Sequence, residues 1–229
     1  MKNSLIISLL ILSVGVCQGE YNYDNLVEIN GVWYKKFSDE SLTGKVYGYF
    51  GKEGKKLTKV YIGELVNGKK EGIWTWWYST GTKIDEMTYK DGEPNGLYTY
   101  WNEDGKKESE GTYKDWEKDG KWTRWYENGQ KMVETYKDGV LDGKLTYWYK
   151  NGQKMDVGTY KDGKRNGLYT YWNEDGKKLT EGNHKDGKRD GLWTDYYENG
   201  QKRSVETYKD GDSISKNCWD KDGSETECE

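Results

Sequence analysis

A glycine recurs at a nearly constant interval through most of this chain, and each copy opens a short aromatic segment. A second glycine follows nine or ten residues later, as in the segment from Gly72 to Gly81. Successive opening glycines are 28, 24, 24, 23, 24 and 24 residues apart; they are Gly44, Gly72, Gly96, Gly120, Gly143, Gly167 and Gly191. A fixed period of this length predicts a repeat array. Because an array repeats one surface many times, whereas an active site is usually built once, the pattern favours binding over catalysis.

Two alternating sets of side chains follow each opening glycine. Successive residues of a strand point to opposite faces, so the third and fifth residues after the glycine share one face. We expect these residues to form a structural ladder on the packed side of the sheet. They are Thr75, Thr99, Thr123, Thr146, Thr170 and Thr194 at the third position, and Trp77, Trp101, Trp125, Trp148, Trp172 and Tyr196 at the fifth.

The opposite face holds the fourth residue after each glycine, which varies more from unit to unit. We expect this variable face to be the binding face. Its aromatic members are Trp76, Tyr100, Tyr147 and Tyr171, and the other two positions hold Arg124 and Asp195.

Glycine-containing turns separate the strands of each unit. The Asn-Gly and Asp-Gly pairs in the middle of a unit tolerate a positive φ at both central positions, which is typical of hairpins. A second tight turn, Lys-Asp-Gly, follows the second strand. Each unit is therefore predicted to be a hairpin of two short strands. In the third unit Trp116 replaces the expected glycine, so we expect that turn to be built differently.

The composition limits the kind of core that the chain can form. Aromatic residues make up 15% of the chain, but only 2 are Phe, against 21 Tyr and 12 Trp, and the mean hydropathy is -1.16. Tyr and Trp combine an apolar ring with a polar group and suit half-wet surfaces. Disordered chains are poor in aromatics, so these periodic ones argue against disorder. We therefore predict an all-β fold with a thin sheet that is wet on both faces.

The amino terminus is distinct from the array. Residues 1–19 resemble a secretory signal peptide, with Lys2, an apolar run too short to span a bilayer, and small residues at the end. Two processing routes stay open: cleavage after Gly19, which we favour, and lipid attachment at Cys17, where the preceding Val16 fits a lipoprotein site poorly. Either route predicts an exported chain, and only lipidation of Cys17 would tie it to a membrane.

The rest of the chain divides into an entry or capping segment (20–43), the repeats (44–211) and a C-terminal cap (212–229). Cys218 and Cys228 remain in the cap once the signal is removed, and an even pair in an exported chain favours a disulfide that closes the tail. Two free thiols are the alternative.

The cap also contains the segment 220–223, which together with Glu229 partly matches a calcium loop, although no helix can follow it. We interpret it as a tight Asp-Gly turn and predict no metal site. The chain has no strand, Gly-rich turn and helix in succession, so we expect no cofactor.

The charge pattern argues against nucleic acid as a partner. The net charge is -4, and removing Lys2 with the signal gives 35 minus 40, or -5. Lys and Glu are finely interspersed, so no basic groove is predicted.

No residue type suggests catalysis. The sole histidine, His184, stands where the other units have Tyr, and no nucleophile or carboxylate is placed beside it to activate it. Glu and Lys residues recur at nearly fixed positions after the mid-unit turns, and we interpret them as solvated opposite-charge pairs across the hairpin. They are Glu86, Glu110, Glu134, Glu181 and Glu206, with Lys83, Lys107, Lys131, Lys154, Lys178 and Lys202.

The unit pattern Gly-x-(Trp/Tyr)-Thr-x-(Trp/Tyr)-(Tyr/Asn)-x-x-Gly-x-Lys, followed by Glu and Tyr-Lys-Asp-Gly, resembles the variant MORN repeat. The likeness covers residues 30–211 and implies a meander of hairpins that forms an elongated, twisted, single-layer antiparallel sheet. Proteins of this family are frequently described as antitoxin components of toxin-antitoxin pairs, so the resemblance also implies a toxin as the partner. An export signal fits a cytoplasmic antitoxin poorly, whereas an exported immunity-like or surface-binding protein would reconcile the two.

A longer repeat is superimposed on the hairpin period. Segment 95–107 is identical to segment 166–178, which lies 71 positions later, or three units (24 + 24 + 23). A three-hairpin block has therefore been duplicated, which is easy where each unit contacts only its neighbours. About fourteen strands at about 4.8 Å spacing would give a rod about 65 Å long.

Three classes of function fit these observations. The first is a non-enzymatic protein that binds a protein partner along its Trp and Tyr residues, which are favoured interface anchors. The second is a glycan or cell-wall binder, since aromatic faces stack on sugars and arrays bind polymers by avidity. The third is a structural spacer of the cell envelope.

Overall fold

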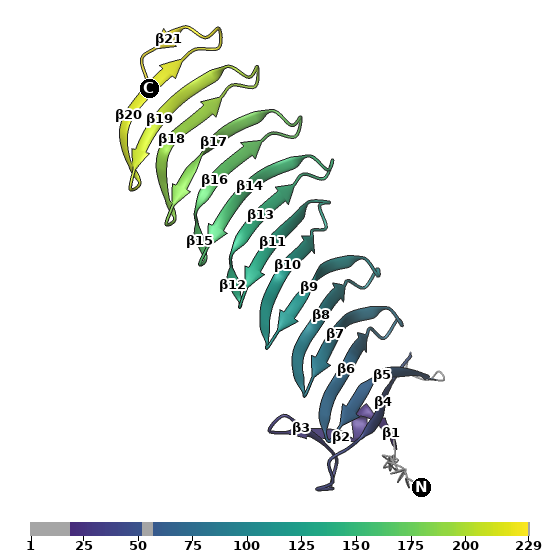
Figure 1. The fold of residues 1–229 in the computed structure, drawn as a ribbon. Helices are drawn as coiled ribbons and strands as arrows, with labels where there is room; N and C mark the ends of the chain where they lie inside the picture. The colour runs from purple at the N-terminus through teal and green to yellow at the C-terminus, as the bar shows by residue number, and fades with distance from the viewer. Residues whose placement is uncertain (1–18, 52–56, 229) are drawn as a thin grey trace, which may run out of the picture.

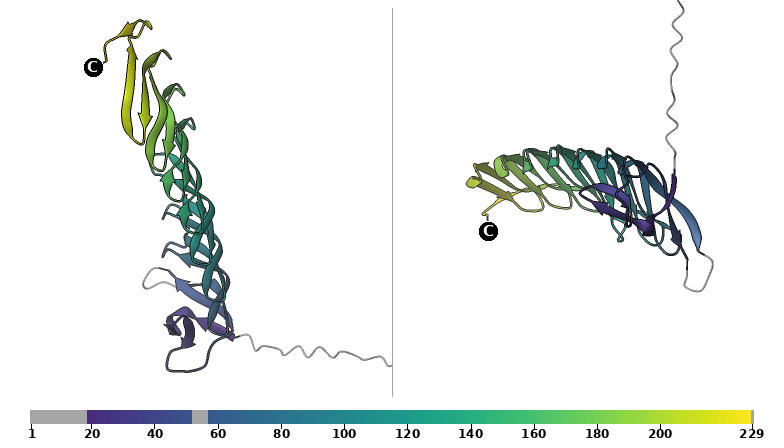
Figure 2. Two further views of the ribbon diagram at one scale, coloured as in Figure 1. Left: turned by 60° about the vertical axis from the view of Figure 1, so that its left-hand side comes forward. Right: turned by 90° about the horizontal axis from the view of Figure 1, so that it is seen from below.

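The computed structural model describes residues 19–51 and 57–228. The predicted signal peptide lies almost wholly outside the described residues, as do Cys17 and Glu229. Within them the chain forms a long antiparallel sheet of consecutive hairpins and no α-helix. Figure 1 shows the hairpins following one another in chain order, and Figure 2 shows that they form one layer that twists along its length. The predicted all-β array of hairpins is confirmed.

The main sheet contains nineteen strands in the described part of the chain. Strands that follow one another along the chain pair antiparallel, whereas β1 (Gly19–Asn22) pairs parallel with β4. The seven hairpins are β4 (Gly44–Phe50) with β5 (Thr58–Val66), β6 (Lys69–Trp77) with β7 (Lys83–Lys90), β8 (Glu93–Trp101) with β9 (Lys107–Lys114), β10 (Glu117–Trp125) with β11 (Lys131–Lys137), β13 (Gly143–Trp148) with β14 (Lys154–Lys161), β16 (Gly167–Trp172) with β17 (Lys178–Lys185), and β18 (Lys188–Tyr196) with β19 (Lys202–Lys209). Two short segments, β12 (Val140–Leu141) and β15 (Lys164–Arg165), lead into β13 and β16.

The most compact core of the molecule lies at the N-terminal end. Here the 3-10 helix η1 (Tyr23–Asn25), β2 (Leu26–Ile29) and β3 (Val32–Lys35) pack against the first hairpins. The buried residues of this cluster are Leu26, Trp33, Leu42, Val46, Ile62, Leu65 and Trp74. Burying one such side chain contributes about 1.5–3 kcal/mol. Residues before the array thus supply a second layer that the rest of the sheet lacks.

The C-terminal end is closed by a disulfide between Cys218 and Cys228. Cys218 lies on β20 (Asp212–Trp219), and Cys228 follows β21 (Glu225–Thr226), which pairs with β20. Between them, the Asp220 carboxylate accepts the amide of Ser224 at 3.0 Å. The acidic segment is therefore a tight turn that its own side chain stabilises.

The Lys-Asp-Gly turns have positive φ at both central residues, as at Asp91 (52°) and Gly92 (89°). This is the geometry of two-residue hairpins. The tip of each turn is also bonded to the preceding hairpin, because the Gly92 amide donates to the Lys70 carbonyl at 2.9 Å. The same bond recurs from Gly139 to Lys118, Gly163 to Leu141, Gly187 to Arg165 and Gly211 to Arg189. The acceptor is always the residue two positions before an opening glycine.

The mid-unit turns are built differently from the prediction. Gly129 has a φ of 84°, but Asn128 is not among the residues with positive φ, so the expectation of two left-handed residues is wrong. The Asn128 carboxamide oxygen instead accepts the amide of Gln130 at 3.0 Å. An Asn that bonds the backbone two residues on favours an ordinary turn followed by one left-handed glycine.

The turn at Trp116 has the same geometry as its glycine counterparts, so the expectation of a different turn is wrong. Asp115 and Trp116 have φ values of 49° and 72°, and the Trp116 amide donates to the Pro94 carbonyl at 3.3 Å. The bond to the preceding hairpin holds the turn in this shape although the residue is not glycine. The indole itself is 60% exposed.

Three tryptophans each lie against a glycine of the preceding strand. A Cβ atom added at Gly111 would lie 2.2 Å from the Trp122 ring, whose Nε1 donates to the Thr112 carbonyl at 3.0 Å. The pairs Gly63 with Trp74 and Gly182 with Trp193 repeat this arrangement. In all three pairs the glycine precedes the tryptophan by eleven residues. The missing side chain makes room for a buried ring in a single-layer sheet.

Replacing Trp116 by Gly is expected to raise the free energy of unfolding by about 1 kcal/mol, because a left-handed conformation costs a non-glycine residue about 1–2 kcal/mol. Urea unfolding of the two proteins measures the difference. Gly187→Ala, at a turn with φ of 89° and space around the new Cβ, is expected to lower the stability by a similar amount. A variant W116G that is no more stable than the parent would contradict this account of the turn.

Replacing Gly111 by Ala is expected to destabilise the protein by about 1–3 kcal/mol, because the new methyl group must displace the Trp122 ring. Gly158 is the matched control, since a Cβ there would meet the Tyr169 ring at an ordinary 3.7 Å. Gly158→Ala is expected to leave the stability unchanged or slightly higher. Equal losses of stability in the two variants, measured by urea unfolding, would show that the ring contact is not the cause.

Candidate binding face

The two faces of the sheet carry different side chains. The face that holds the second and fourth residues after each opening glycine is called the aromatic face. The face that holds the third and fifth residues is called the threonine face. The second residues are Trp74, Tyr98, Trp122, Leu145, Tyr169 and Trp193. Opposite the opening glycines, the second strands add a further row to the aromatic face: Tyr89, Tyr113, Tyr136, Tyr160, His184 and Tyr208.

Burial is shared between the two faces. On the threonine face Thr75, Thr146 and Thr170 are buried, and the tryptophans of the predicted ladder are half-buried. The largest buried side chains of the repeats lie on the aromatic face instead, at Trp74, Trp122, Leu145 and Trp193. Each hairpin therefore packs its rings against its neighbours along the sheet and leaves both faces in contact with water.

Cations lie over the rings of the aromatic face. The Lys118 ammonium is 4.3 Å from the centroid of the Trp122 ring, and the Arg189 guanidinium is 4.2 Å from that of Trp193. Lys70 and Arg165 occupy the same position in their units. Burial lowers the pKa of Lys118, and the charge of Arg124 lowers it further, while Glu134 opposes both effects.

Pairs of tyrosine hydroxyls join neighbouring hairpins on this face. The Tyr149 hydroxyl donates to the Trp172 carbonyl at 2.8 Å and lies 3.2 Å from the Tyr171 hydroxyl. Tyr78 and Tyr100 form the equivalent pair at 3.5 Å. Bonding to Tyr100 and burial raise the pKa of Tyr78 to about 12, and burial with the bond to Tyr171 raises that of Tyr149. The hydroxyls of Tyr78 and Tyr149 therefore keep their protons at physiological pH.

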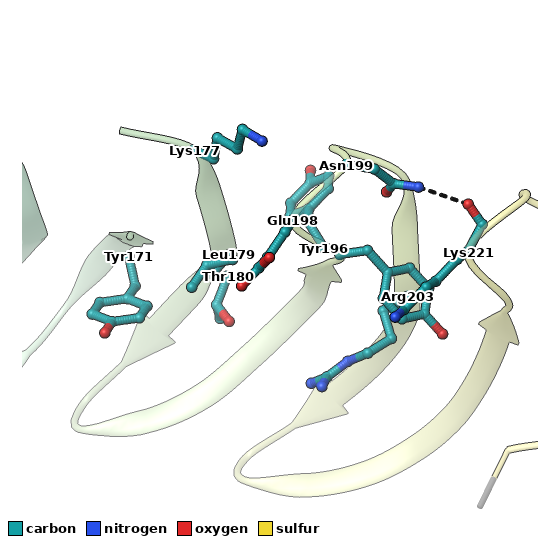
Figure 3. Close-up of a pocket in the computed structure, with 10 residues that line it drawn as sticks. Tyr171, Lys177, Leu179, Thr180, Tyr196, Glu198, Asn199, Arg203 and Lys221 are labelled. Carbon is teal, nitrogen blue, oxygen red and sulfur yellow. Dashed lines mark hydrogen bonds between the residues drawn. The ribbon is translucent and has the colours of Figure 1, made fainter. Parts of the chain in front are cut away.

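Several hollows open on the described part of the sheet, and two of them contain predicted binding residues. The N-terminal hollow, of about 510 Å³, is lined by Tyr98, Tyr100, Tyr113, Trp122 and Arg124 among others. The C-terminal hollow, of about 760 Å³, includes Tyr171, Thr180, Tyr196 and Arg203, which Figure 3 shows around it.

The two hollows share part of their lining through the three-hairpin duplication, whereas the counterparts of Tyr98, Tyr113, Lys118, Trp122 and Arg124 do not line the C-terminal hollow. Six lining residues of the first, Tyr100, Glu108, Ser109, Trp125, Tyr126 and Glu127, correspond at a shift of 71 positions to Tyr171, Leu179, Thr180, Tyr196, Tyr197 and Glu198 of the second. The block duplication has therefore duplicated a concave site and not only a length of sheet.

The structure places the residues predicted for the binding face in different surroundings. Tyr100 and Tyr171 line the two hollows, and Tyr147 lies opposite Asp156 in the hairpin just before the second one. Trp76 belongs to the N-terminal core, where its ring lies 4.9 Å from that of Tyr23. Lys118 and Arg189 were not singled out by sequence reasoning. The sequence does contain a signal for these cations, because a Lys or Arg stands two positions before four of the opening glycines.

Two carboxylates are half-buried among these rings. Asp85 lies opposite Trp76 on one side and Tyr100 on the other, and Asp156 is its equivalent 71 positions later. Burial raises the pKa of Asp85 to about 6, and Lys70 opposes the shift. Burial also raises the pKa of Asp156, against the charge of Arg165.

The Lys and Glu side chains pair along one strand, not across the hairpin as predicted. The Lys178 ammonium lies 2.7 Å from the Glu181 carboxylate, and Lys83 with Glu86 and Lys107 with Glu110 form the same contact. Residues three apart in a strand normally face opposite sides. A bulge just after each lysine brings the two charges to the threonine face.

Glu134 and Glu206 do not belong to this series. Glu134 lies opposite Trp122, and Glu206 lies opposite Trp193, so both are on the aromatic face. The fourth hairpin, formed by β10 and β11, is one residue shorter and its two strands pair without a bulge, which moves Glu134 to the other side. The predicted single ladder of glutamates is therefore wrong at these two positions.

His184 takes the place of a ring in the tyrosine row. It packs edge-on against Trp193 at 4.9 Å between centroids and is buried. Burial lowers its pKa, and Arg165 and Arg189 lower it further. The surroundings are those of a packed ring that stays neutral.

Among residues 19–51 and 57–228, no cluster of three or more His, Cys, Asp and Glu side chains could hold a metal ion. No helix in the described part of the chain has the length and apolar character needed to cross a membrane.

Comparison with known proteins identifies the repeats. The family model described as MORN repeat variant matches residues 70–91, 94–115, 118–138, 141–162, 165–186 and 189–210, which is more than half of the chain. No curated protein sequence matches it. Among solved structures, "Crystal Structure of TarM" is 12% identical over 53% of this chain and 20% of that chain, with a TM-score of 0.23. The chain thus spans about a fifth of that protein, and a TM-score this low does not establish a shared fold.

Replacing Asp85 by Asn is expected to raise the melting temperature at pH 7. The folded pKa lies above the unfolded value of 3.8, so the neutral acid is favoured in the folded state. Stability is then greatest below about pH 4 and falls as the pH rises from about 4 to about 6. The advantage of the Asn variant is expected to appear over that range and to vanish below it, as measured by thermal unfolding against pH. Asp162→Asn, at an exposed turn, is the control, and an equal gain there would contradict the assignment.

Proposed function

Because the chain belongs to the MORN repeat variant family, whose repeats generally mediate protein or membrane interactions, we propose that it is a non-enzymatic scaffold that binds a protein partner along its aromatic face. The observation that carries this proposal is the duplicated pair of hollows. A site that occurs twice at a fixed spacing on a rigid rod binds one elongated partner by avidity.

The side chains of the hollows support a protein partner. Tyr, Trp and Arg dominate the energetic centres of protein interfaces, and Tyr100 and Arg124 stand together in the N-terminal hollow. The rings are held by their neighbours, as Tyr171 is by the hydroxyl of Tyr149, so little side-chain entropy is lost when a partner binds. Buried rings such as Trp122 are covered by cations and offer no open platform for stacking on sugars.

Export from the cytoplasm is part of the same proposal. The signal-like sequence of residues 1–19 supports it, and so does the disulfide between Cys218 and Cys228, because disulfides persist in oxidising compartments. The partner would then be a protein met outside the cytoplasm. A toxin is the form of partner that the family resemblance implies.

The double variant Tyr100→Ala with Tyr171→Ala is expected to lose the partner while keeping its fold, because both side chains are only half-buried and line the hollows. The measurement is crosslinking and co-purification of the mature chain from its own host, with the melting temperature taken in parallel.

The matched control is Leu97→Ala with Leu168→Ala, which removes two exposed side chains from the threonine face of the same hairpins. This control is expected to retain the partner. Loss of the partner in the control alone would place the binding on the threonine face. A shift in tryptophan fluorescence with purified glycans at sub-millimolar concentration would favour the glycan-binding alternative instead.

A further inference from the structure

One row of exposed side chains along the edge of the sheet has a charge pattern of its own. The row consists of the first residue after the tip of each tight turn that joins two hairpins, and it is named the turn row. In Figure 1 these turns follow one another along one edge of the rod. Each member pairs with the residue three positions earlier, as Glu93 does with Lys90, so all of them have the same place in their turns. From the N-terminal end the row is Lys69, Glu93, Glu117, Val140, Lys164, Lys188 and Asp212.

The side chains of the turn row lie along the edge, each close to the tip of the next turn. A Cβ atom added at Gly139 would lie 3.2 Å from the carboxyl carbon of Glu117. One added at Gly211 would lie 3.4 Å from Cδ of Lys188. Successive members of the row are two strands apart, or about 10 Å. The row is therefore a continuous strip of surface along the rod.

The charges of the turn row have no counterions within the described residues. None of its three lysines, two glutamates and one aspartate forms an ion pair or a hydrogen bond there through its side chain. Glu117 and Lys164 lie four strands apart, or about 19 Å, which is more than twice the Debye length of about 8 Å at physiological ionic strength. Their attraction within one chain is therefore screened, and both remain available to a second molecule.

The other charges of the turns preserve this pattern. Six of the seven turns carry one Lys and one Asp just before the tip, and these two charges cancel. Counted over six residues of each turn, the net charge is +1 for 66–71, -1 for 90–95, 114–119 and 137–142, +2 for 161–166, +1 for 185–190 and -1 for 209–214. The turn edge is therefore acidic before its centre and basic after it, with one turn of the opposite sign at each end.

The turn row is complementary to itself when it is reversed. Glu117 and Lys164 stand one unit before and one unit after Val140, and Glu93 and Lys188 stand two units before and after it. In an antiparallel second copy, each glutamate therefore faces a lysine. A two-fold axis brings the same surface of two molecules together in this way, and every pair then occurs twice.

The ends of the row fix the register. Lys69 and Asp212 stand three units before and after Val140, so they also face each other in this alignment. Sliding one copy by one unit would place Lys69 against Lys188, or Glu93 against Asp212, depending on the direction. A parallel copy would place every charge against its own kind, and such contacts are costly. The antiparallel alignment centred on Val140 is the one that pairs every charge of the row with its opposite.

Exposed apolar side chains lie at the centre of this alignment. Val140 is 45% exposed and would meet Val140 of the second copy on the axis. The Trp116 indole, which is 60% exposed beside Glu117, would meet the turn that holds Lys164 of the second copy, and a ring attracts a cation. Exposed ion pairs alone contribute little. Burial of these side chains adds an apolar contribution at the axis.

This contact leaves the aromatic face open. Tyr89 belongs to the tyrosine row of that face and pairs with Pro94. The next residues along the two strands, Lys90 and Glu93, therefore point to the opposite side of the sheet. A second copy at the turn row and a protein partner on the aromatic face would occupy different surfaces.

We propose that two copies of this chain associate antiparallel through their turn rows, around a two-fold axis at Val140, with Glu117 and Glu93 of each copy facing Lys164 and Lys188 of the other. The contact is one row wide, so the dimer is weak, with a dissociation constant in the micromolar range. The inference is independent of the proposed function, because it concerns another surface and a second copy of the chain.

The first test is sedimentation equilibrium of the mature chain over a series of concentrations. A dimer that dissociates on dilution is expected. Its dissociation constant is expected to rise when the ionic strength is raised to about 1 M, where the Debye length falls to about 3 Å. Because association stabilises the folded chain, the gain in stability expected for Trp116→Gly applies to protein that is dilute enough to be monomeric.

The second test reverses charges in one half of the row. The double variant Lys164→Glu with Lys188→Glu is expected to bind itself about a hundredfold more weakly, because four attractive pairs per dimer become repulsive. Glu93→Lys with Glu117→Lys is expected to do the same. An equimolar mixture of the two variants is expected to form a heterodimer, since one row is then acidic on both sides of Val140 and the other is basic.

The matched control is Lys150→Glu with Lys202→Glu. Both lysines are exposed and lie at the mid-unit turns, away from the turn row, and the change in net charge equals that of the first double variant. This control is expected to dimerise like the parent protein. The melting temperature of each variant, taken in parallel, reports whether it folds.

Four outcomes would overturn the inference. They are a parent protein that stays monomeric up to about 1 mM, unchanged self-association of either charge-reversed variant, failure of the two variants to pair when mixed, and equal weakening in the control. The Tyr100→Ala and Tyr171→Ala variant keeps the whole turn row, so it is expected to dimerise like the parent protein. Its partner binding therefore tests the proposed function separately.

Discussion

The rest of the structure depends on one backbone hydrogen bond, in which the amide at the tip of each Lys-Asp-Gly turn donates to a carbonyl of the preceding hairpin. A single-layer sheet has no second layer to fix the relative position of its hairpins. Strand pairing between hairpins, as between β7 and β8, holds them side by side, and the bond from Gly139 to Lys118 and its equivalents add one further fixed point per unit. In four units the acceptor residue is also a cation whose side chain lies over a ring of the aromatic face, as Lys118 lies over Trp122. Backbone and side chain at this position are therefore fixed together, and the cations of the aromatic face are held in place by the next unit along the rod.

This restraint explains why Trp116 adopts a glycine conformation. The turn must present its amide to Pro94 whichever residue occupies the tip, so the cost appears as backbone strain and not as a change of turn. Sequence reasoning treats the turn residues as the cause of the turn. In an array, the neighbouring hairpin determines the turn as well.

The hairpins, their number and the three-unit duplication could be predicted from the sequence, because each of them appears there as residues that recur at a fixed interval. It did not predict which face Glu134 would occupy, since a bulge that is present in most units is absent from the shorter fourth unit. One residue more or less moves every later side chain of a strand to the opposite face. The burial of Trp122 could not be predicted from the period either. It depends on Gly111, eleven residues earlier, and the spacing of the opening glycines does not reveal this pair. The binding role of Tyr100 and Tyr171 stays a prediction from the sequence, whereas their place in two hollows could only be found from the structure, because each hollow is lined by residues of several strands.

Both ends of the sheet are sealed. At one end, β1 adds a short parallel strand beside β4 and the N-terminal core lies next to it; at the other, β21 is two residues long and tied down by the disulfide. An open edge of a long flat sheet would recruit further chains and grow into a fibre. The length of the described rod follows from the number of hairpins that one chain contains. Duplicating three hairpins therefore places a second set of the same side chains at a fixed distance from the first along the sheet.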